Sequence, residues 1–89
     1  MKRVKVSLDN MKKITEFNKT VNKLSFDLIV CKNKWRVDAK SLMGLFSLDL
    51  SEPIQLYYNS EYDEEVNKVL KEWIIPINDN DPLYIVGRI

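Results

Sequence analysis

The sequence predicts an α+β domain, in which helices cover one face of an antiparallel sheet. Segments in which apolar and polar residues alternate, as in strands, are interspersed along the chain with segments that have the pattern of amphipathic helices. A tight turn around Asn33 joins two of the strand segments directly, so these strands are antiparallel. At 89 residues, the chain is long enough for one domain with its own core. The expected order is β-α-β-β-α-β-α, with four strands in the sheet.

The first strand and the first helix have the clearest patterns. Val4, Val6 and Leu8 alternate with polar residues, which is typical of a half-buried strand. Asp9 and Asn10 are candidate N-caps for a helix that runs to about residue 22. Its apolar stripe recurs at three- and four-residue steps and consists of Met11, Ile14, Phe17, Val21 and Leu24.

A hairpin is predicted next. Phe26, Leu28 and Val30 form its first strand, the segment 32–34 forms the turn, and Trp35 and Val37 lie on the returning strand. Asn33 tolerates the left-handed conformation that such a turn requires. The single cysteine, Cys31, is expected to fill space in the core or at the sheet edge.

A short helix is predicted over residues 39–48, with Asp38 as its cap. Gly44 lies inside it, although glycine in a helix costs about 1 kcal/mol relative to alanine. We therefore expect another element to approach the helix closely at Gly44.

The last strand and helix follow a break at Pro53. Alternating Ile54, Leu56 and Tyr58 predict the fourth strand. The last helix is expected to open at residue 60 in near capping-box fashion and to stop at residue 76. Its expected core stripe is Tyr62, Val66, Val69, Leu70 and Trp73.

Composition narrows the function. The chain contains no histidine, which removes the commonest metal ligand and the usual acid–base group at neutral pH. We therefore expect no metal or cofactor site. We also expect no enzymatic activity, because nothing in the sequence combines a nucleophile with a base, and the acidic cluster of the last helix indicates a solvated face (Glu61, Asp63, Glu64 and Glu65). One cysteine allows no internal disulfide, and no membrane span or signal peptide is visible, so a cytoplasmic protein is expected.

The charges divide between the two halves of the chain. Residues 1–40 carry 11 Lys/Arg and 4 Asp/Glu, whereas residues 41–89 carry 3 and 9. The lysines are scattered over strand, helix and turn, which disfavours nucleic-acid binding. A solvated basic face, or one that attracts an acidic protein, explains the pattern better.

The segment KSLMGLFSL, residues 40–48, resembles the histidine phosphocarrier protein (HPr) family of the sugar phosphotransferase system. The family's spacing continues over the matching positions Asp27–Val30, Asn33, Val37, Lys40, Ser41, Met43, Gly44, Ser47 and Leu48. The resemblance covers residues 3–75 and implies an open-faced β-sandwich. It divides the chain into an HPr-like domain, 1–75, and a C-terminal extension, 76–89. The β-prone run 83–86 of the extension could add a strand to the sheet, cover an exposed patch or pair with another chain.

The resemblance also places the family's phosphohistidine site. The histidine that carries the phosphoryl group corresponds to Asn10, and the neighbouring arginine corresponds to Lys12. An asparagine amide cannot accept and return a phosphoryl group, so this degenerate site cannot serve a histidine phosphocarrier. Asn10 is then simply an N-cap. The alternative is a residual anion pocket at Asn10 and Lys12.

Two further features follow from the resemblance. Ser41, directly after Lys40, falls on the regulatory serine that an HPr kinase phosphorylates in some bacteria; the alternative is that Ser41 only caps the second helix. The residues matching Leu42, Met43 and Phe46 form a docking patch in the family, although Met43 and Phe46 could instead close the core.

The function implied is a regulatory, non-catalytic protein-binding module of the phosphotransferase system or of bacterial carbon regulation, similar in logic to catabolite-repression HPr-like proteins. Its partners would be proteins, such as an HPr kinase or a transcription regulator, and the chain would be a monomer or a weak dimer. The alternative is a structural or assembly module that reuses the fold without any phosphorylation.

Overall fold

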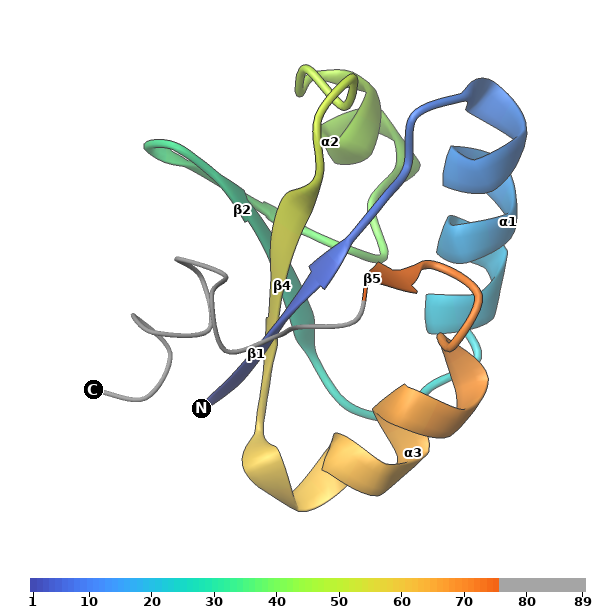
Figure 1. Cartoon of the computed structure of the whole chain (residues 1–89), viewed down its shortest axis with the longest axis vertical. Coiled ribbons are helices and arrows are strands. Elements are labelled where there is room, and N and C mark those ends of the chain that lie inside the picture. The colour runs from blue at the N-terminus through green and yellow to red at the C-terminus, as the bar shows by residue number, and fades with distance from the viewer. Residues whose placement is uncertain (76–89) are drawn as a thin grey trace.

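The computed structural model describes residues 1–75. The elements are β1 (Lys2–Val6), α1 (Met11–Val21), β2 (Leu28–Lys32), β3 (Trp35–Asp38), α2 (Leu42–Phe46), β4 (Ile54–Tyr58), the 3₁₀ turn η1 (Ser60–Tyr62), α3 (Asp63–Val69) and β5 (Ile74–Ile75). The strands form one sheet in the order β3-β2-β4-β1-β5, with every pair antiparallel. The helices lie on one side of this sheet (Figure 1). The α+β class and the open-faced arrangement are therefore confirmed, whereas the predicted extension lies outside the described residues.

The sheet contains one strand more than the four that were expected. Ile74 and Ile75 form β5, which pairs with Val6 and Lys5 of β1. A two-residue strand is too short to show a period of two, so the sequence pattern could not reveal it.

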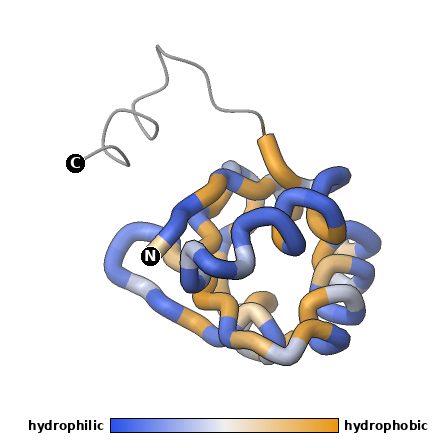
Figure 2. Tube along the Cα trace, turned by 90° about the horizontal axis from the view of Figure 1, so that it is seen from below, coloured by the Kyte–Doolittle hydropathy of each residue, from blue (hydrophilic) through white to orange (hydrophobic). Residues whose placement is uncertain are grey.

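The two central strands, β1 and β4, follow the predicted alternation. Val4 lies opposite Leu56 and Val6 opposite Ile54, and all four side chains are buried. Hydrophobic and hydrophilic positions alternate along these segments (Figure 2). The face of the sheet that turns toward the helices is therefore the apolar one.

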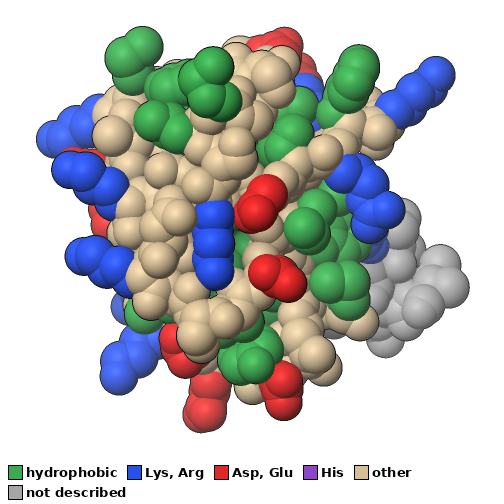
Figure 3. All heavy atoms as spheres, turned by 180° about the vertical axis from the view of Figure 1, so that it is seen from behind, with side chains coloured by type: hydrophobic (Ala, Val, Ile, Leu, Met, Phe, Trp, Pro, Cys, Tyr) green, Lys and Arg blue, Asp and Glu red, His purple; other side chains and the backbone are tan. Residues whose placement is uncertain are grey.

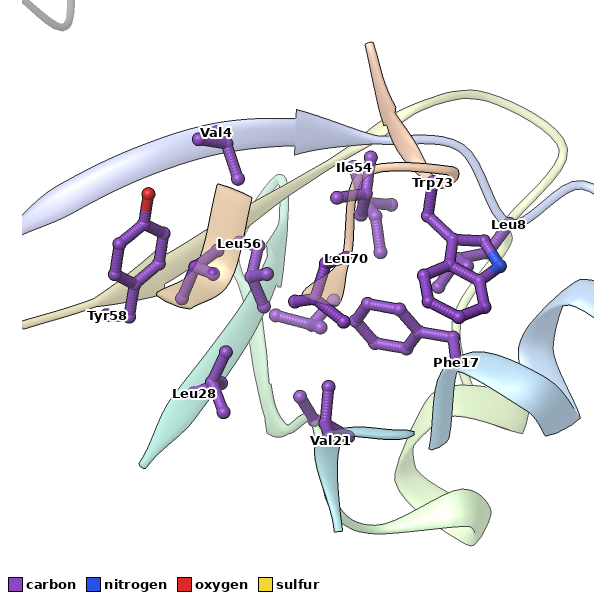
Figure 4. Close-up of a cluster of buried hydrophobic side chains, with 14 of the residues drawn as sticks. Val4, Leu8, Phe17, Val21, Leu28, Ile54, Leu56, Tyr58, Leu70 and Trp73 are labelled. Carbon is purple, nitrogen blue, oxygen red and sulfur yellow. The ribbon is translucent and has the colours of Figure 1, made fainter. Parts of the chain in front are cut away.

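The core fills the space between this face and the helices. Phe17 of α1 meets Trp73, which follows α3, edge to face with ring centroids 5.6 Å apart (Figure 4). Leu28 and Tyr58 extend the cluster along the sheet. Among residues 1–75, no polar or charged residue is buried apart from the tyrosine and tryptophan counted in this core.

The β2–β3 hairpin has the predicted turn, and its two alternating apolar residues differ in burial. Asn33 has φ 55°, the left-handed conformation expected there. Val37 packs partly against the core, but Trp35 is 68% exposed. The reason is its position: Trp35 lies next to the turn, where the hairpin projects beyond the helices (Figure 1).

The second helix is shorter than predicted, and its cap is different. Helix α2 covers Leu42–Phe46, and Ser41 rather than Asp38 is the N-cap. The backbone N–H of Ala39 still donates to the carbonyl of Leu28, so the chain remains attached to the sheet at residue 39. Asp38 accepts a hydrogen bond from the backbone of Lys40 instead, which turns the chain before the helix begins.

The position of Gly44 leaves little room for a side chain. A Cβ at this position would lie 3.2 Å from the Cβ of Val37 and 3.2 Å from the Oγ of Ser41. These contacts are tight, so the absent side chain lets α2 lie closely on β3. The predicted close approach is confirmed.

The last helix starts later and ends earlier than predicted. Residues 60–62 form a 3₁₀ turn capped by Asn59, and the α-helix runs only from Asp63 to Val69. Asp63 does not complete a capping box, because its carboxylate accepts a hydrogen bond of 2.6 Å from the Tyr58 hydroxyl. Trp73 is buried as predicted, although it follows the helix rather than belonging to it.

Candidate functional site

The start of α1 is organised by its own side chains. Asn10 has the extended conformation of an N-cap, and its Oδ1 accepts a hydrogen bond of 2.8 Å from the backbone N–H of Lys13. The interpretation of Asn10 as an N-cap is confirmed. Lys13 Nζ lies 2.9 Å from Asp9 Oδ1, and the hydrogen bond and positive charge of Lys13 lower the pKa of Asp9. A carboxylate therefore already lies at this helix end.

Lys12 is exposed and forms no ion pair within the described part of the chain. It projects from the first turn of α1, next to the capping Asn10. The alternative prediction, an anion pocket at Asn10 and Lys12, would depend on the charge of Lys12 at a helix end that already holds the carboxylate of Asp9.

Ser41 is exposed at the start of α2. Its Oγ accepts a hydrogen bond of 3.1 Å from the backbone N–H of Gly44. The serine therefore caps the helix, and its hydroxyl oxygen is also accessible from solvent. Capping and phosphorylation both remain compatible with this position.

The ammonium group of Lys40 is bound by the segment that follows α1. Its Nζ donates to the carbonyl of Leu24 at 2.8 Å, beyond the C-terminal end of α1. Its own carbonyl accepts a hydrogen bond from the side chain of Asn22, and the neighbouring carbonyl of Ala39 accepts one from Asn18. The side chains of α1 thus fix the loop that leads to Ser41.

The short helix α2 presents an apolar surface. Met43 is 81% exposed and Phe46 is 44% exposed, while Leu42 packs partly against the core and Leu45 is buried. Met43 and Phe46 therefore do not close the core within the described residues. Hydrophobic side chains also gather at the α2 end of the molecule in the space-filling view (Figure 3).

The predicted residues form two groups that share the helical side of the sheet. Ser41, Met43 and Phe46 belong to α2 or its cap, whereas Asn10 and Lys12 lie at the start of α1. The hydrogen bonds from Asn18 and Asn22 tie the second half of α1, and not its start, to the loop before α2.

Sequence reasoning missed an exposed group on the hairpin. Lys34, Trp35 and Arg36 are all exposed, whereas the sequence pattern had only placed Trp35 on the returning strand beside Val37. The clue available in the sequence was a tryptophan flanked on both sides by cations, next to a tight turn. Arg36 also borders a hollow on the outer face of the sheet, and no carboxylate of residues 1–75 lines it.

Other kinds of site find no support in residues 1–75. No group of three His, Cys, Asp or Glu side chains there could hold a metal ion. No helix in this part of the chain has the length and apolar composition needed to cross a membrane.

Comparison with solved structures identifies the family. The crystal structure of HPr-C-His from Thermoanaerobacter tengcongensis is 30% identical in sequence, with a TM-score of 0.67 over 81% of this chain and 89% of that chain. Phosphocarrier protein HPr from Bacillus anthracis str. Ames is 29% identical, with a TM-score of 0.66 over 83% of this chain and 94% of that chain. Neither the family models nor the curated proteins include a match. With this identity over nearly the whole length of a relative, the chain belongs to the HPr family of phosphocarrier proteins.

Proposed function

We propose that this chain is a regulatory protein-binding module of the HPr family that does not carry phosphate on histidine. The first support is chemical, because the sequence contains no histidine. By the family resemblance, the place of the phosphohistidine is taken by Asn10, whose side chain caps α1. An amide oxygen in this role stabilises the helix but cannot form a transferable phosphoramidate.

The observation that carries the binding function is the exposure of Met43 and Phe46. Met43 is 81% exposed, so a partner can bury this apolar side chain without first breaking its contacts with the rest of the domain. Both residues lie within one five-residue helix that Ser41 caps. The proposed docking surface therefore consists of Leu42, Met43 and Phe46.

Phosphorylation of Ser41 would act on this surface through charge. A phosphate adds a charge of about −1.5 to −2 at neutral pH. Placed at the cap of α2, it would lie two residues from Met43 and change the partner that the surface accepts. Lys40 Nζ would have to leave the Leu24 carbonyl before it could bind this phosphate.

The proposal is tested first by mass spectrometry of the intact protein after incubation with ATP and an HPr kinase. Ser41→Ala is the control, and Ser47→Ala is the matched variant at the other end of α2. We expect the wild type and Ser47→Ala to gain one phosphate and Ser41→Ala to gain none. A gain in Ser41→Ala would assign the modification to another residue.

The alternative function, an assembly module without phosphorylation, is favoured by the cap itself. Ser41 Oγ already satisfies the backbone N–H of Gly44, which is a sufficient reason for a serine at this position. If no phosphate is gained, the Met43 and Phe46 surface is left as a constitutive docking site. Met43→Ser and Phe46→Ser would then weaken partner binding while Ser41→Ala would not.

A further inference from the structure

We propose that the free edge of β3 binds an acidic polypeptide segment in extended conformation, which adds a strand to the sheet. This site differs from the Leu42, Met43 and Phe46 surface, although α2 packs closely on β3 between Gly44 and Val37. Three features support it: the backbone groups at the edge, two cations that have no partner among residues 1–75, and the exposed Trp35.

The edge offers backbone hydrogen-bonding groups. Within residues 1–75, β3 pairs only with β2 and is the outermost strand on its side of the sheet. The backbone N–H of Ala39 donates to the Leu28 carbonyl, and every second residue of β3 faces β2 in the same way. Arg36 falls between these positions, so its N–H and C=O point away from β2. The carbonyl of Asp38 also points away from β2, but it already accepts a hydrogen bond from the backbone N–H of Ser41.

The charges around this edge are positive and available. Lys34 and Arg36 are exposed, and their side chains form no hydrogen bond or ion pair within the described part of the chain. Lys13 and Lys32, by contrast, are paired with Asp9 and Glu52. The one carboxylate on β3, Asp38, accepts a hydrogen bond from the backbone of Lys40.

A hollow of about 480 Å³ on the outer sheet face gives room for acidic side chains. The described residues that line it are Cys31, Asn33, Lys34, Arg36, Gln55 and Tyr57, which include two cations and no carboxylate. Side chains of a strand laid beside β3 alternate between the two faces. Those on the Arg36 side would enter this cationic region.

The opposite face of the same edge is apolar. Trp35 is 68% exposed and shares its side of the strand with the half-buried Val37. An added strand would place its intervening residues against this pair. The segment that fits therefore alternates acidic residues with apolar residues.

A polypeptide fits this site better than a nucleic acid. Single-stranded nucleic acids bind through bases stacked on open aromatic rings along a cationic groove. The exposed ring of Trp35 lies on the other face of β3 from Arg36, so the aromatic ring that lines the cationic hollow is that of Tyr57. The ring of Tyr57 is covered by the guanidinium of Arg3, 5.7 Å from the ring centroid. Its hydroxyl is also engaged, donating to Gln55 at 2.7 Å and accepting from Arg3 at 3.1 Å.

The first test uses the full chain and a fluorescein-labelled peptide in which Glu and Val alternate, at a concentration where the peptide is monomeric. Fluorescence anisotropy measures binding to the wild type, to Arg36→Gln and Lys34→Gln, and to the matched control Lys71→Gln. Loss of one charge-assisted contact should weaken binding about tenfold in Arg36→Gln. Lys71→Gln should bind like the wild type, and circular dichroism should show all variants folded.

The second test separates strand addition from simple charge attraction. The same peptide, methylated on alternate backbone nitrogens, keeps its charge but cannot complete the hydrogen bonds of a ladder. We expect this peptide not to bind, and amide shifts of the wild type with the unmodified peptide to concentrate on β3. Charged residues also protect edge strands from aggregation, and a purely protective edge would bind neither peptide.

Besides the absence of binding to either peptide, three results would overturn the proposal. The first is equal binding of the methylated and unmodified peptides. The second is an equal loss in Lys71→Gln and Arg36→Gln. The third is stronger binding of an oligothymidylate at the same residues, which would assign the surface to nucleic acid.

Discussion

At the scale of single residues, side chains that look functional in the sequence serve as structural bonds. Asn10, Ser41 and Asp63 each accept a hydrogen bond that holds a helix or a turn in place. Because capping residues are polar and lie at exposed helix ends, they resemble binding residues in a sequence. Substitutions distinguish the two roles, since a cap affects stability whether or not a partner is present.

Replacement of Asn10 by alanine should lower the free energy of unfolding by about 1 kcal/mol, because the N–H of Lys13 loses its acceptor. Asn10→Asp should retain most of the stability, since a carboxylate also caps. Urea denaturation at neutral pH measures both. If Asn10→Ala were as stable as the wild type, the cap would not contribute, and the anion-pocket interpretation would gain weight.

Tyr58 and Asp63 make acid stability testable. The hydrogen bond from Tyr58, and more weakly the nearby Lys2, lower the pKa of Asp63 despite some burial. The unfolded chain therefore binds more protons than the folded chain in moderate acid, so stability rises with pH there. The contribution of Asp63 is present above its unfolded pKa of 3.8 and is lost as pH falls through the lower folded value.

In Tyr58→Phe we expect a loss of about 1 kcal/mol at neutral pH, because Asp63 loses its hydroxyl donor. The fall in stability as the pH is lowered below about 5 should also be shallower than in the wild type. Urea midpoints across this range measure the slope. Equal slopes would show that Tyr58 does not stabilise the ionised carboxylate.

At the scale of elements, α1 controls the position of α2. Asn18 and Asn22 bind the carbonyls of Ala39 and Lys40, while the Lys40 ammonium returns to Leu24 at the end of α1. A cation at a helix C-terminus also interacts favourably with the helix dipole. Hydrogen bonds therefore join the loop before Ser41 to the end of α1 in both directions, with donors from the helix end and a donor from the loop.

Lys40→Met should lower the free energy of unfolding by about 1 kcal/mol, because the carbonyl of Leu24 loses a charged donor. Lys23→Met is the matched control, since Lys23 is an exposed lysine close to the same end of α1. Thermal denaturation of the two variants gives the comparison. Equal stability would leave Lys40 available for a partner, as the family resemblance implies.

At the scale of the whole molecule, the core is a single cluster between the sheet and the helices. It contains the large aromatic pair Phe17 and Trp73, both almost fully buried. On the surface, basic side chains line the α1 side, whereas acidic side chains gather at the α3 end (Figure 3). The charge difference between the halves of the sequence thus becomes a charge difference between regions of one domain.

Phe17→Ala should cost about 3–5 kcal/mol, because it leaves a cavity beside Trp73. A small domain has a total stability of about 5–15 kcal/mol, so the variant should lose much of its margin. Calorimetry measures the decrease. Met11→Ala, which changes an exposed residue of the same helix, should leave the transition nearly unchanged.

The two tryptophans should report different environments. In Trp35→Phe the remaining Trp73 is 5% exposed, so emission should be blue-shifted and resistant to iodide quenching. In Trp73→Phe the remaining Trp35 is 68% exposed, so emission should be red-shifted and readily quenched. The reverse order would contradict the orientation of the β2–β3 hairpin.

The sequence alone determined the elements whose cause is local. Period-two alternation predicted β1 and β4, the three- and four-residue steps predicted α1, and Asn33 predicted the turn. It also determined, through the absence of histidine, that no phosphohistidine can form. Each of these depends on neighbours in the chain or on composition.

Only the tertiary structure decided the features that depend on distant partners. The β5 strand exists because Ile74 and Ile75 reach β1, and α2 starts late because Ala39 is still bonded to Leu28. Trp35 is exposed because its end of the hairpin extends beyond the helices, although its position in the strand pattern matches that of Val37. Strand pairing and burial that depend on segments distant in the chain produce no local periodicity. For that reason, neither the β5 strand nor the exposure of Trp35 could be predicted from the sequence.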